Sequence, residues 1–147
     1  KDRREVASIC KLMTTMLTFE EIDKGNISLE DKFVASEYAC SMEGSQAFLD
    51  FNQEYTVADL LKSVIVASAN DSAVVLAENI AGSEQEFVRL MNEKAKSLGM
   101  NNTKYINATG LSEEGKEQYS CCVDTAMSKN ICKSYNIFLP AIICPGK

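Results

Sequence analysis

Apolar residues recur every three or four positions in three stretches of this chain, a spacing that places them on one face of a helix. The first stretch begins at Ser8, runs to Phe19 and predicts a helix that ends near Gly25. The second covers residues 57–65 and the third covers residues 87–98. Each helix should bury its apolar face, so the pattern predicts a core built mainly from helices.

Polar residues mark the ends of the second and third predicted helices. Thr56 with Asp59, and Ser83 with Glu86, form capping-box patterns in front of apolar runs. In such a pattern a side-chain oxygen accepts a hydrogen bond from the first turn of the helix. Gly99 is the expected residue just beyond the third helix, because glycine adopts the left-handed conformation there without strain.

Elsewhere the periodicity is weak and the predicted elements are short. Extended pieces are predicted at Ile27–Leu29, Lys32–Ala35 and Lys104–Asn107. A helical turn is predicted at Ser36–Cys40, and a last helix at Cys121–Ser134. Loops are predicted at Gly44–Asn52 and Ala108–Gln118. We therefore expect a mainly α structure with, at most, small two-stranded β pairs.

Length and charge narrow the function. The 147 residues, 46% of them hydrophobic, suit a single domain with an adequate core. The 21 acidic and 15 basic residues give a net charge of −6 without a basic stripe, which argues against a nucleic-acid partner. No apolar run approaches the roughly 20 residues that span a bilayer, and no signal-peptide pattern opens the chain.

The chain contains no histidine, which excludes Ser-His-Asp and Cys-His catalysis and removes the commonest metal ligand. The absence of histidine therefore favours a lysine as the catalytic base. The six cysteines lack the paired C-x-x-C spacing of a zinc site, and we expect no metal and no cofactor. Small buried thiols are favoured over a disulfide framework, although Cys10 beside Lys11 could be unusually reactive.

Ser8 and Lys11 form a Ser-x-x-Lys pattern at the start of the first predicted helix. Residues three apart share a helical face, so the hydroxyl and the amine can come within hydrogen-bonding reach. An uncharged amine can accept the hydroxyl proton during attack, provided that burial, a second cation or the helix N-terminus lowers its pKa. Taken alone, the pattern also fits Ser8 as an N-cap and Lys11 as a solvated residue.

Ser68 and Asn70 form a second candidate site at residues 67–71, where small and amide residues interrupt the apolar pattern before it resumes. Two helices should therefore meet at a short polar junction. On such a junction Ser68 could relay a proton and Asn70 could hold a substrate amide or the lysine. The alternative is that both residues satisfy helix ends, with Asp71 as an N-cap.

The two motifs together change this interpretation. Ser-x-x-Lys at a helix start, followed some sixty residues later by Ser-x-Asn, is the order found in penicillin-binding proteins and serine β-lactamases. Further blocks resemble the low-molecular-weight D-alanyl-D-alanine carboxypeptidases: Val6–Thr14, Gly44–Ser45, Tyr55–Leu61, Ser68–Asp71, Leu76–Glu78, Met91–Ala95, Leu98–Met100, Asn107–Leu111 and Tyr119–Ser120. The resemblance runs to about Tyr135. It implies that residues 1–147 form the helical part of a single transpeptidase-like α/β domain whose central sheet is largely missing from this chain.

The chain departs from the family pattern at several positions. Val6, Cys10 and Ala69 replace the usual proline, threonine and glycine, which are small changes. The third motif, Lys-Thr-Gly on a sheet strand, has no match. That strand would supply a substrate-binding lysine, a second oxyanion donor and one wall of the cleft. We therefore expect negligible hydrolysis by these residues alone, a Lys11 exposed to water, and a marginally stable, association-prone protein.

The resemblance implies a serine-type D-Ala-D-Ala carboxypeptidase that acts on peptidoglycan stem peptides through an acyl-enzyme, in cell-wall biogenesis. Ser8 would be the nucleophile, Lys11 its base, Ser68 the proton relay and Asn70 the substrate-binding residue. β-Lactams would acylate the same Ser8. The expected location is extracytoplasmic, in the bacterial envelope or periplasm or secreted, with membrane contact only through segments outside this chain.

Two alternatives remain at this point. One is a non-catalytic helical fragment or binding module of the same ancestry. The other is a serine β-lactamase, which the family-specific blocks disfavour. A β-lactamase also needs a deacylating carboxylate, for which the sequence offers no convincing candidate, although Glu113 and Glu114 lie in a loop that could approach a site.

Overall fold

The computed structural model describes residues 3–115, with side chains from residue 10 onward. The elements in chain order are α1 (Arg3–Asp23), β1 (Lys32–Val34), α2 (Glu37–Cys40), β2 (Glu54–Thr56), α3 (Val57–Ala67), α4 (Asn70–Ala81) and α5 (Glu84–Ser97). The described part of the chain is thus mainly α with one two-stranded sheet, as the sequence predicts. The predicted helix at Cys121–Ser134 and the end of the predicted loop at Ala108–Gln118 lie outside the described residues.

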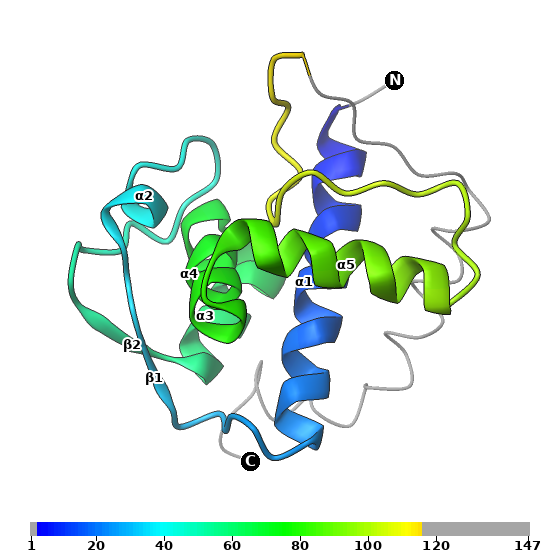
Figure 1. Cartoon of the computed structure of the whole chain (residues 1–147). Coiled ribbons are helices and arrows are strands. Elements are labelled where there is room, and N and C mark those ends of the chain that lie inside the picture. Colours follow the sequence, from blue (N-terminus) through cyan, green and yellow to red (C-terminus); the bar gives the residue numbers. More distant parts are fainter. Residues whose placement is uncertain (1–2, 116–147) are drawn as a thin grey trace.

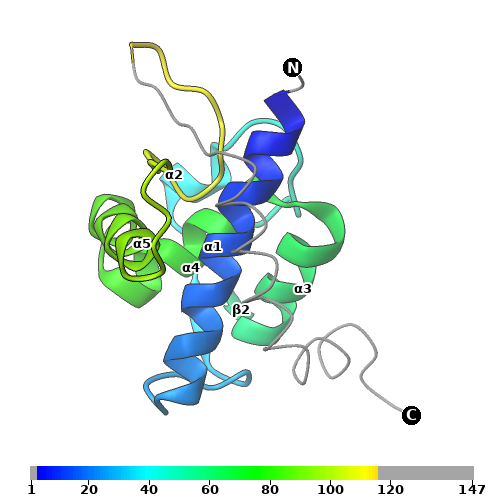
Figure 2. The same cartoon turned by 90° about the vertical axis from the view of Figure 1, so that its right-hand side faces the viewer.

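Helix α4 is the centre of the arrangement, because α1, α2, α3, α5 and β1 all contact it. Helix α1 runs upright in Figure 1, with the N-terminus at its upper end. Figure 2 shows α3 and α5 on opposite sides of α1, and both helices contact it. No helix of the described residues is both long and apolar enough to cross a bilayer.

The core consists of two hydrophobic clusters that share α1 and α4. The first joins the α3–α4 pair to the strands through residues such as Phe19, Leu61 and Val74. The second joins α1 to α5 through residues such as Met13 and Phe87. From residue 10 to residue 19, α1 is buried on all sides except at Leu12, which is partly buried. This burial exceeds the single buried face that the periodicity predicts.

The buried threonine hydroxyl groups of α1 all form hydrogen bonds with backbone carbonyl groups. Thr15 and Thr18 each donate to the carbonyl of the residue four positions earlier, at 2.7 and 2.8 Å. Thr14 donates to the carbonyl of Ala108 at 2.8 Å, which ties the 107–111 turn to α1. These bonds let a helix with several threonines pass through an apolar core, because unpaired buried hydroxyls would be costly.

The predicted helix ends are confirmed at α3 and α5. Thr56 Oγ1 accepts a hydrogen bond from the Asp59 N–H at 3.2 Å, and Ser83 Oγ accepts one from the Glu86 N–H at 3.1 Å. Gly99 follows α5 with a φ of +76°. Local sequence is sufficient here because each cap involves residues only three apart.

The start of α1 differs from the prediction. The helix begins at Arg3, so Ser8 lies in its second turn and the interpretation of Ser8 as an N-cap is wrong. Residues 3–7 contain neither glycine nor proline, and nothing in them stops a helix from extending backwards from Ser8. Asp71 is not an N-cap either, because Ala69 occupies the N-cap position of α4.

The extended pieces are confirmed only in part. Strand β1 lies within the predicted Lys32–Ala35 and pairs antiparallel with β2, which the sequence did not reveal. Ile27–Leu29 and Lys104–Asn107 are not strands. At the second of these, the Asn92 side chain takes both backbone groups of Tyr105, donating to its carbonyl and accepting from its N–H at 2.9 Å each. A side-chain amide of α5 thus binds the backbone of Tyr105, and Lys104 beside it is an isolated bridge residue.

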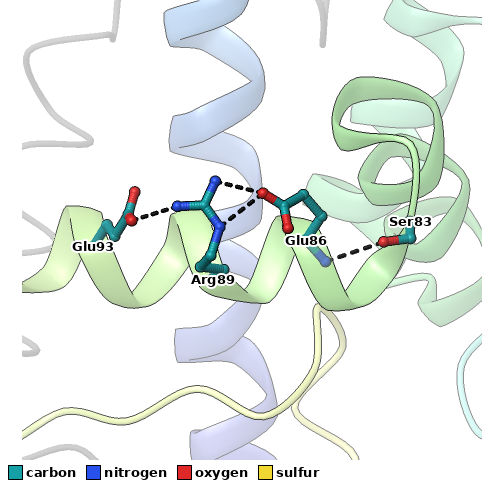
Figure 3. A network of polar contacts seen from close by, with 4 residues as sticks. All are labelled: Ser83, Glu86, Arg89 and Glu93. Carbon is teal, nitrogen blue, oxygen red and sulfur yellow. Dashed lines mark hydrogen bonds and ion pairs between the residues drawn. The ribbon is translucent and has the colours of Figure 1, made fainter.

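Charged side chains cover the outer face of α5. Arg89 bonds with Glu86 one turn before it and with Glu93 one turn after it, beside the Ser83 cap (Figure 3). All three charged residues are exposed, so these pairs add little stability. Lys94 and Glu20 form an ion pair between α5 and α1. Both of these side chains are partly buried, so water screens this pair less than it screens the pairs of Arg89.

The central position of α4 predicts unequal effects of the same substitution at two valines. Val74→Ala, at a side chain with 0% exposure, should lower the free energy of unfolding by about 2–3 kcal/mol through lost burial and a cavity. Val66→Ala is the matched control, and at 67% exposure it should change stability by less than about 0.5 kcal/mol. Urea unfolding of both variants measures the difference. Equal effects would contradict the placement of α4 at the core.

Candidate active site

The junction between α3 and α4 carries the Ser-x-Asn motif. Ser68 caps the C-terminus of α3 in a left-handed conformation, with φ 55° and ψ 40°. Such a conformation is uncommon for a residue other than glycine, and it ends the helix abruptly. Helix α4 then starts at Asn70, so Ser68 and Asn70 lie on a turn between two buried helices, as the sequence predicts.

Lys11 and Ser68 meet although they are 57 residues apart in the sequence. Lys11 Nζ donates a hydrogen bond to Ser68 Oγ at 3.0 Å. The structure therefore brings the base and the relay of the predicted site together.

Lys11 is buried, with only 6% of its surface exposed. The expectation of a water-exposed Lys11 is therefore wrong. Helix α1, which carries this lysine, packs against α3, α4 and α5. Burial lowers the pKa of Lys11 below its ordinary value of 10.5, and the neighbouring Cys10 opposes this effect. A lysine base requires a shift in this direction, because only the uncharged amine can accept a proton.

Cys10 is not a reactive thiol. Its side chain is buried in the second core cluster, and burial raises its pKa to about 12 although Lys11 acts in the opposite direction. The thiolate is the reactive form, so the possibility of an unusually reactive Cys10 is contradicted. Among the described residues, no cluster of three or more cysteine, aspartate or glutamate side chains could hold a metal ion.

Asn70 is buried at the start of α4 and held by the loop that follows α2. Its backbone N–H donates to the Ser45 carbonyl at 2.7 Å, and Nδ2 donates to the Glu43 carbonyl at 2.7 Å. The Glu43 carbonyl fixes the orientation of the amide, because only the NH₂ group can donate to it. Within the described part of the chain, Oδ1 has no hydrogen-bond partner. One acceptor therefore remains for a substrate or for the lysine.

Ser8 lies three residues before Lys11 in α1, on the face that Lys11 shares. Along the helix axis the two residues are separated by about 4.5 Å, from three rises of 1.5 Å. This backbone position places Ser8 about one helical turn before Lys11 in α1.

Sequence reasoning about individual residues considered Asp71 only as an N-cap, and it did not single out Gly44, whose backbone lies beside Asn70. A Cβ atom at Gly44 would lie 2.9 Å from Asn70 Nδ2 and 3.9 Å from a Leu111 methyl carbon. The Gly44 loop and the 107–111 turn therefore lie together beside Asn70. Gly44 and Asp71 both fall in blocks that resemble the family, which was the available signal. Glu113 accepts a hydrogen bond from Asn107 at 3.1 Å, which ties it to the same turn.

Comparison with known proteins gives a consistent result. The sequence profile of the D-alanyl-D-alanine carboxypeptidase family matches residues 1–139. The D-alanyl-D-alanine carboxypeptidase DacF of Bacillus subtilis is 49% identical over 137 residues, which are 92% of this chain and 35% of DacF. DacA of Haemophilus influenzae is 36% identical over 128 residues, which are 85% of this chain and 32% of DacA. The chain thus spans about a third of the length of these curated relatives.

Solved structures show the same fold. The crystal structure of DacD from Francisella tularensis superposes with a TM-score of 0.83 at 38% identity, over 92% of this chain and 32% of DacD. Penicillin-binding protein D2 from Listeria monocytogenes, in its ampicillin-bound form, superposes with a TM-score of 0.77 at 28% identity, over 90% of this chain and 54% of that protein. The expected fold class, a helical part of the penicillin-binding-protein fold, is confirmed. From its sequence and its fold alike, this chain belongs to the D-alanyl-D-alanine carboxypeptidase family.

Proposed function

We propose that this chain supplies the nucleophile, the base and the proton relay of a serine-type D-Ala-D-Ala carboxypeptidase that acts on peptidoglycan stem peptides. The hydrogen bond from Lys11 Nζ to Ser68 Oγ carries the proposal, because it joins the two motifs in one site. Family membership supports the same reaction class.

Acylation is the first step of the proposed reaction. The Ser8 hydroxyl attacks the carbonyl carbon of the penultimate D-alanine, and uncharged Lys11 accepts the hydroxyl proton. The buried position of Lys11 favours this uncharged form, since water no longer stabilises the ammonium. The attack forms an ester bond between the enzyme and the substrate acyl group.

Departure of the terminal D-alanine needs a proton on its nitrogen. Ser68 already accepts a hydrogen bond from Lys11 and can pass the proton from the amine to the leaving group. Asn70 offers its free Oδ1 to an N–H of the bound peptide, which orients the scissile bond. Water then hydrolyses the ester and regenerates Ser8.

The proposed substrate implies the partners and the location. Peptides ending in D-Ala-D-Ala occur in peptidoglycan, so we place the protein outside the cytoplasm, in the envelope or periplasm or secreted. β-Lactams are the expected inhibitors and acylate the same serine. The ampicillin-bound and cefotaxime-bound structures of the Listeria protein support this expectation.

Fluorescent penicillin tests the nucleophile directly. We expect covalent labelling of the chain at Ser8, detected on a denaturing gel and by mass spectrometry of the labelled peptide. Ser8→Ala should abolish the label, whereas Ser97→Ala, which removes an exposed hydroxyl on α5, should leave it unchanged. Persistent labelling of Ser8→Ala would rule out Ser8 as the nucleophile.

The lowered pKa of Lys11 predicts the pH dependence of acylation. The labelling rate should rise as pH increases through this pKa, because more molecules then carry the uncharged amine, and it should level off above it. The midpoint should lie below 10.5, the ordinary lysine value. Lys11→Arg should label negligibly at every pH, because a guanidinium stays protonated. A rate that falls as pH rises through the range in which the chain stays folded would exclude Lys11 as the base.

Hydrolysis should require parts that these 147 residues do not contain. The chain alone has no Lys-Thr-Gly motif, and loss of one oxyanion donor typically lowers the rate by about 10²–10³. We therefore expect negligible release of D-alanine from a D-Ala-D-Ala peptide. A chimera in which this chain replaces the matching segment of Bacillus subtilis DacF should release D-alanine in a Ser8-dependent manner. Steady turnover by the chain alone, abolished by Ser8→Ala, would disprove the need for the missing strand.

A further inference from the structure

Asp71 is a buried carboxylate that the proposed reaction does not use. It follows Asn70 in the first turn of α4 and is only 1% exposed. Oδ1 accepts hydrogen bonds from the N–H groups of Ala47 and Ser72, at 2.9 Å each. Oδ2 accepts from the N–H groups of Ala47 and Leu49, at 3.1 and 3.2 Å. Two of the three donors belong to the loop between α2 and β2.

This loop has a backbone that needs external support. It contains no strand or helix between residues 42 and 52, and Gly44, Phe48 and Asn52 have φ values of +81°, +57° and +62°. Phe48 lies between the two residues that bond to Asp71, and its side chain is 81% exposed. A bulky residue with positive φ is strained. Because the Phe48 ring is exposed, its side chain gains no burial that could offset this strain. The hydrogen bonds to Asp71 supply the compensating interaction.

The same loop holds the side chain of Asn70. The Glu43 carbonyl accepts from Asn70 Nδ2, and the Ser45 carbonyl accepts from the Asn70 N–H. Between them, the backbone of Gly44 approaches so closely that a Cβ there would collide with Nδ2. The position of the Asn70 amide therefore depends on the position of residues 43–45.

We infer that Asp71 is a positioning residue of the active site. It fixes the loop at Ala47 and Leu49, and the loop in turn fixes the Asn70 amide so that Oδ1 is presented to the substrate. Asp71 itself touches no reacting group in this scheme. The inference rests on the proposed function, because Asn70 has a substrate to orient only if this site binds the substrate that Ser8 attacks.

Asp71→Asn is the most direct test because it conserves shape. The amide NH₂ group cannot accept a hydrogen bond, so at least one of the Leu49 and Ser72 N–H groups loses its partner in either orientation. We expect faster hydrogen exchange at the amides of Ala47 and Leu49 in the 147-residue chain. In the chain and in the DacF chimera, acylation by fluorescent penicillin should fall about 10–100-fold, since small displacements of positioned groups cost this much. Asp59→Asn is the matched control, because Asp59 is an exposed carboxylate in the first turn of α3. It should change neither the hydrogen exchange of the loop nor the rate of acylation.

A double-mutant cycle separates positioning from a general loss of stability. In an Asn70→Ala background, Asp71→Asn should slow acylation by less than about twofold, because the amide that it positions is already absent. A purely structural role would reduce the rate by the same factor in both backgrounds. That result, or normal acylation of the Asp71→Asn single variant, would overturn the inference and leave the proposed function intact.

Two further outcomes complete the test. If the melting curve shows that Asp71→Asn is unfolded at the assay temperature, Gly44→Ala decides. It keeps the Asp71 carboxylate, and it disturbs the contact between the loop and the Asn70 amide, because the added Cβ would lie 2.9 Å from Asn70 Nδ2. A similar loss of acylation then supports the inference, and normal acylation overturns it. If neither the unsubstituted chain nor the unsubstituted chimera is labelled, the proposed function fails and the inference fails with it.

Discussion

The burial of Lys11 is the constraint on which this structure depends. A lysine amine in an apolar environment loses the hydration of its charged form, so it needs a polar partner nearby. Ser68 provides that partner, and its hydroxyl can do so only where the backbone turns between α3 and α4. The packing of α1 against the α3–α4 pair is therefore also the step that assembles the candidate site.

The polar junction lies against an otherwise apolar core, and its neighbours satisfy most of its hydrogen-bonding groups. Ser63 Oγ bonds with Ser72 Oγ at 2.6 Å, and the loop after α2 serves both Asn70 and Asp71. Among the described residues of this junction, Asn70 Oδ1 is a buried acceptor without a hydrogen-bond partner, and the proposed mechanism uses it to bind the substrate. A buried polar group without a hydrogen-bond partner is costly, and most other polar groups of the junction have partners. The unpaired Asn70 Oδ1 is therefore the exception that needs an explanation.

The chain covers about a third of its curated relatives and contains no Lys-Thr-Gly motif. Even so, the described part has two connected hydrophobic clusters and a buried lysine. The parts that hold Lys11, Ser68 and Asn70 in place are local to the helices and to the loops at 43–49 and 107–111. The Lys-Thr-Gly motif, which we expect to bind the substrate carboxylate and to complete the oxyanion hole, would be a separate part of the proposed site.

Local patterns were sufficient wherever the stabilising groups are close in sequence. The caps at Thr56 and Ser83 and the glycine after α5 involve residues within one helical turn, and the sequence alone identified them. The order and spacing of the two motifs, with the surrounding blocks, were likewise enough to identify the family.

Only the tertiary structure decided the features that depend on distant partners. The Asn92 side chain bonds to the backbone of Tyr105, Lys11 is buried rather than exposed, and Ser68 adopts a left-handed conformation although it is not glycine. The role of Asp71 also depends on a loop 22 to 24 residues earlier in the chain. In each case the favourable interaction appears only after the helices have packed, so neither periodicity nor composition could reveal it.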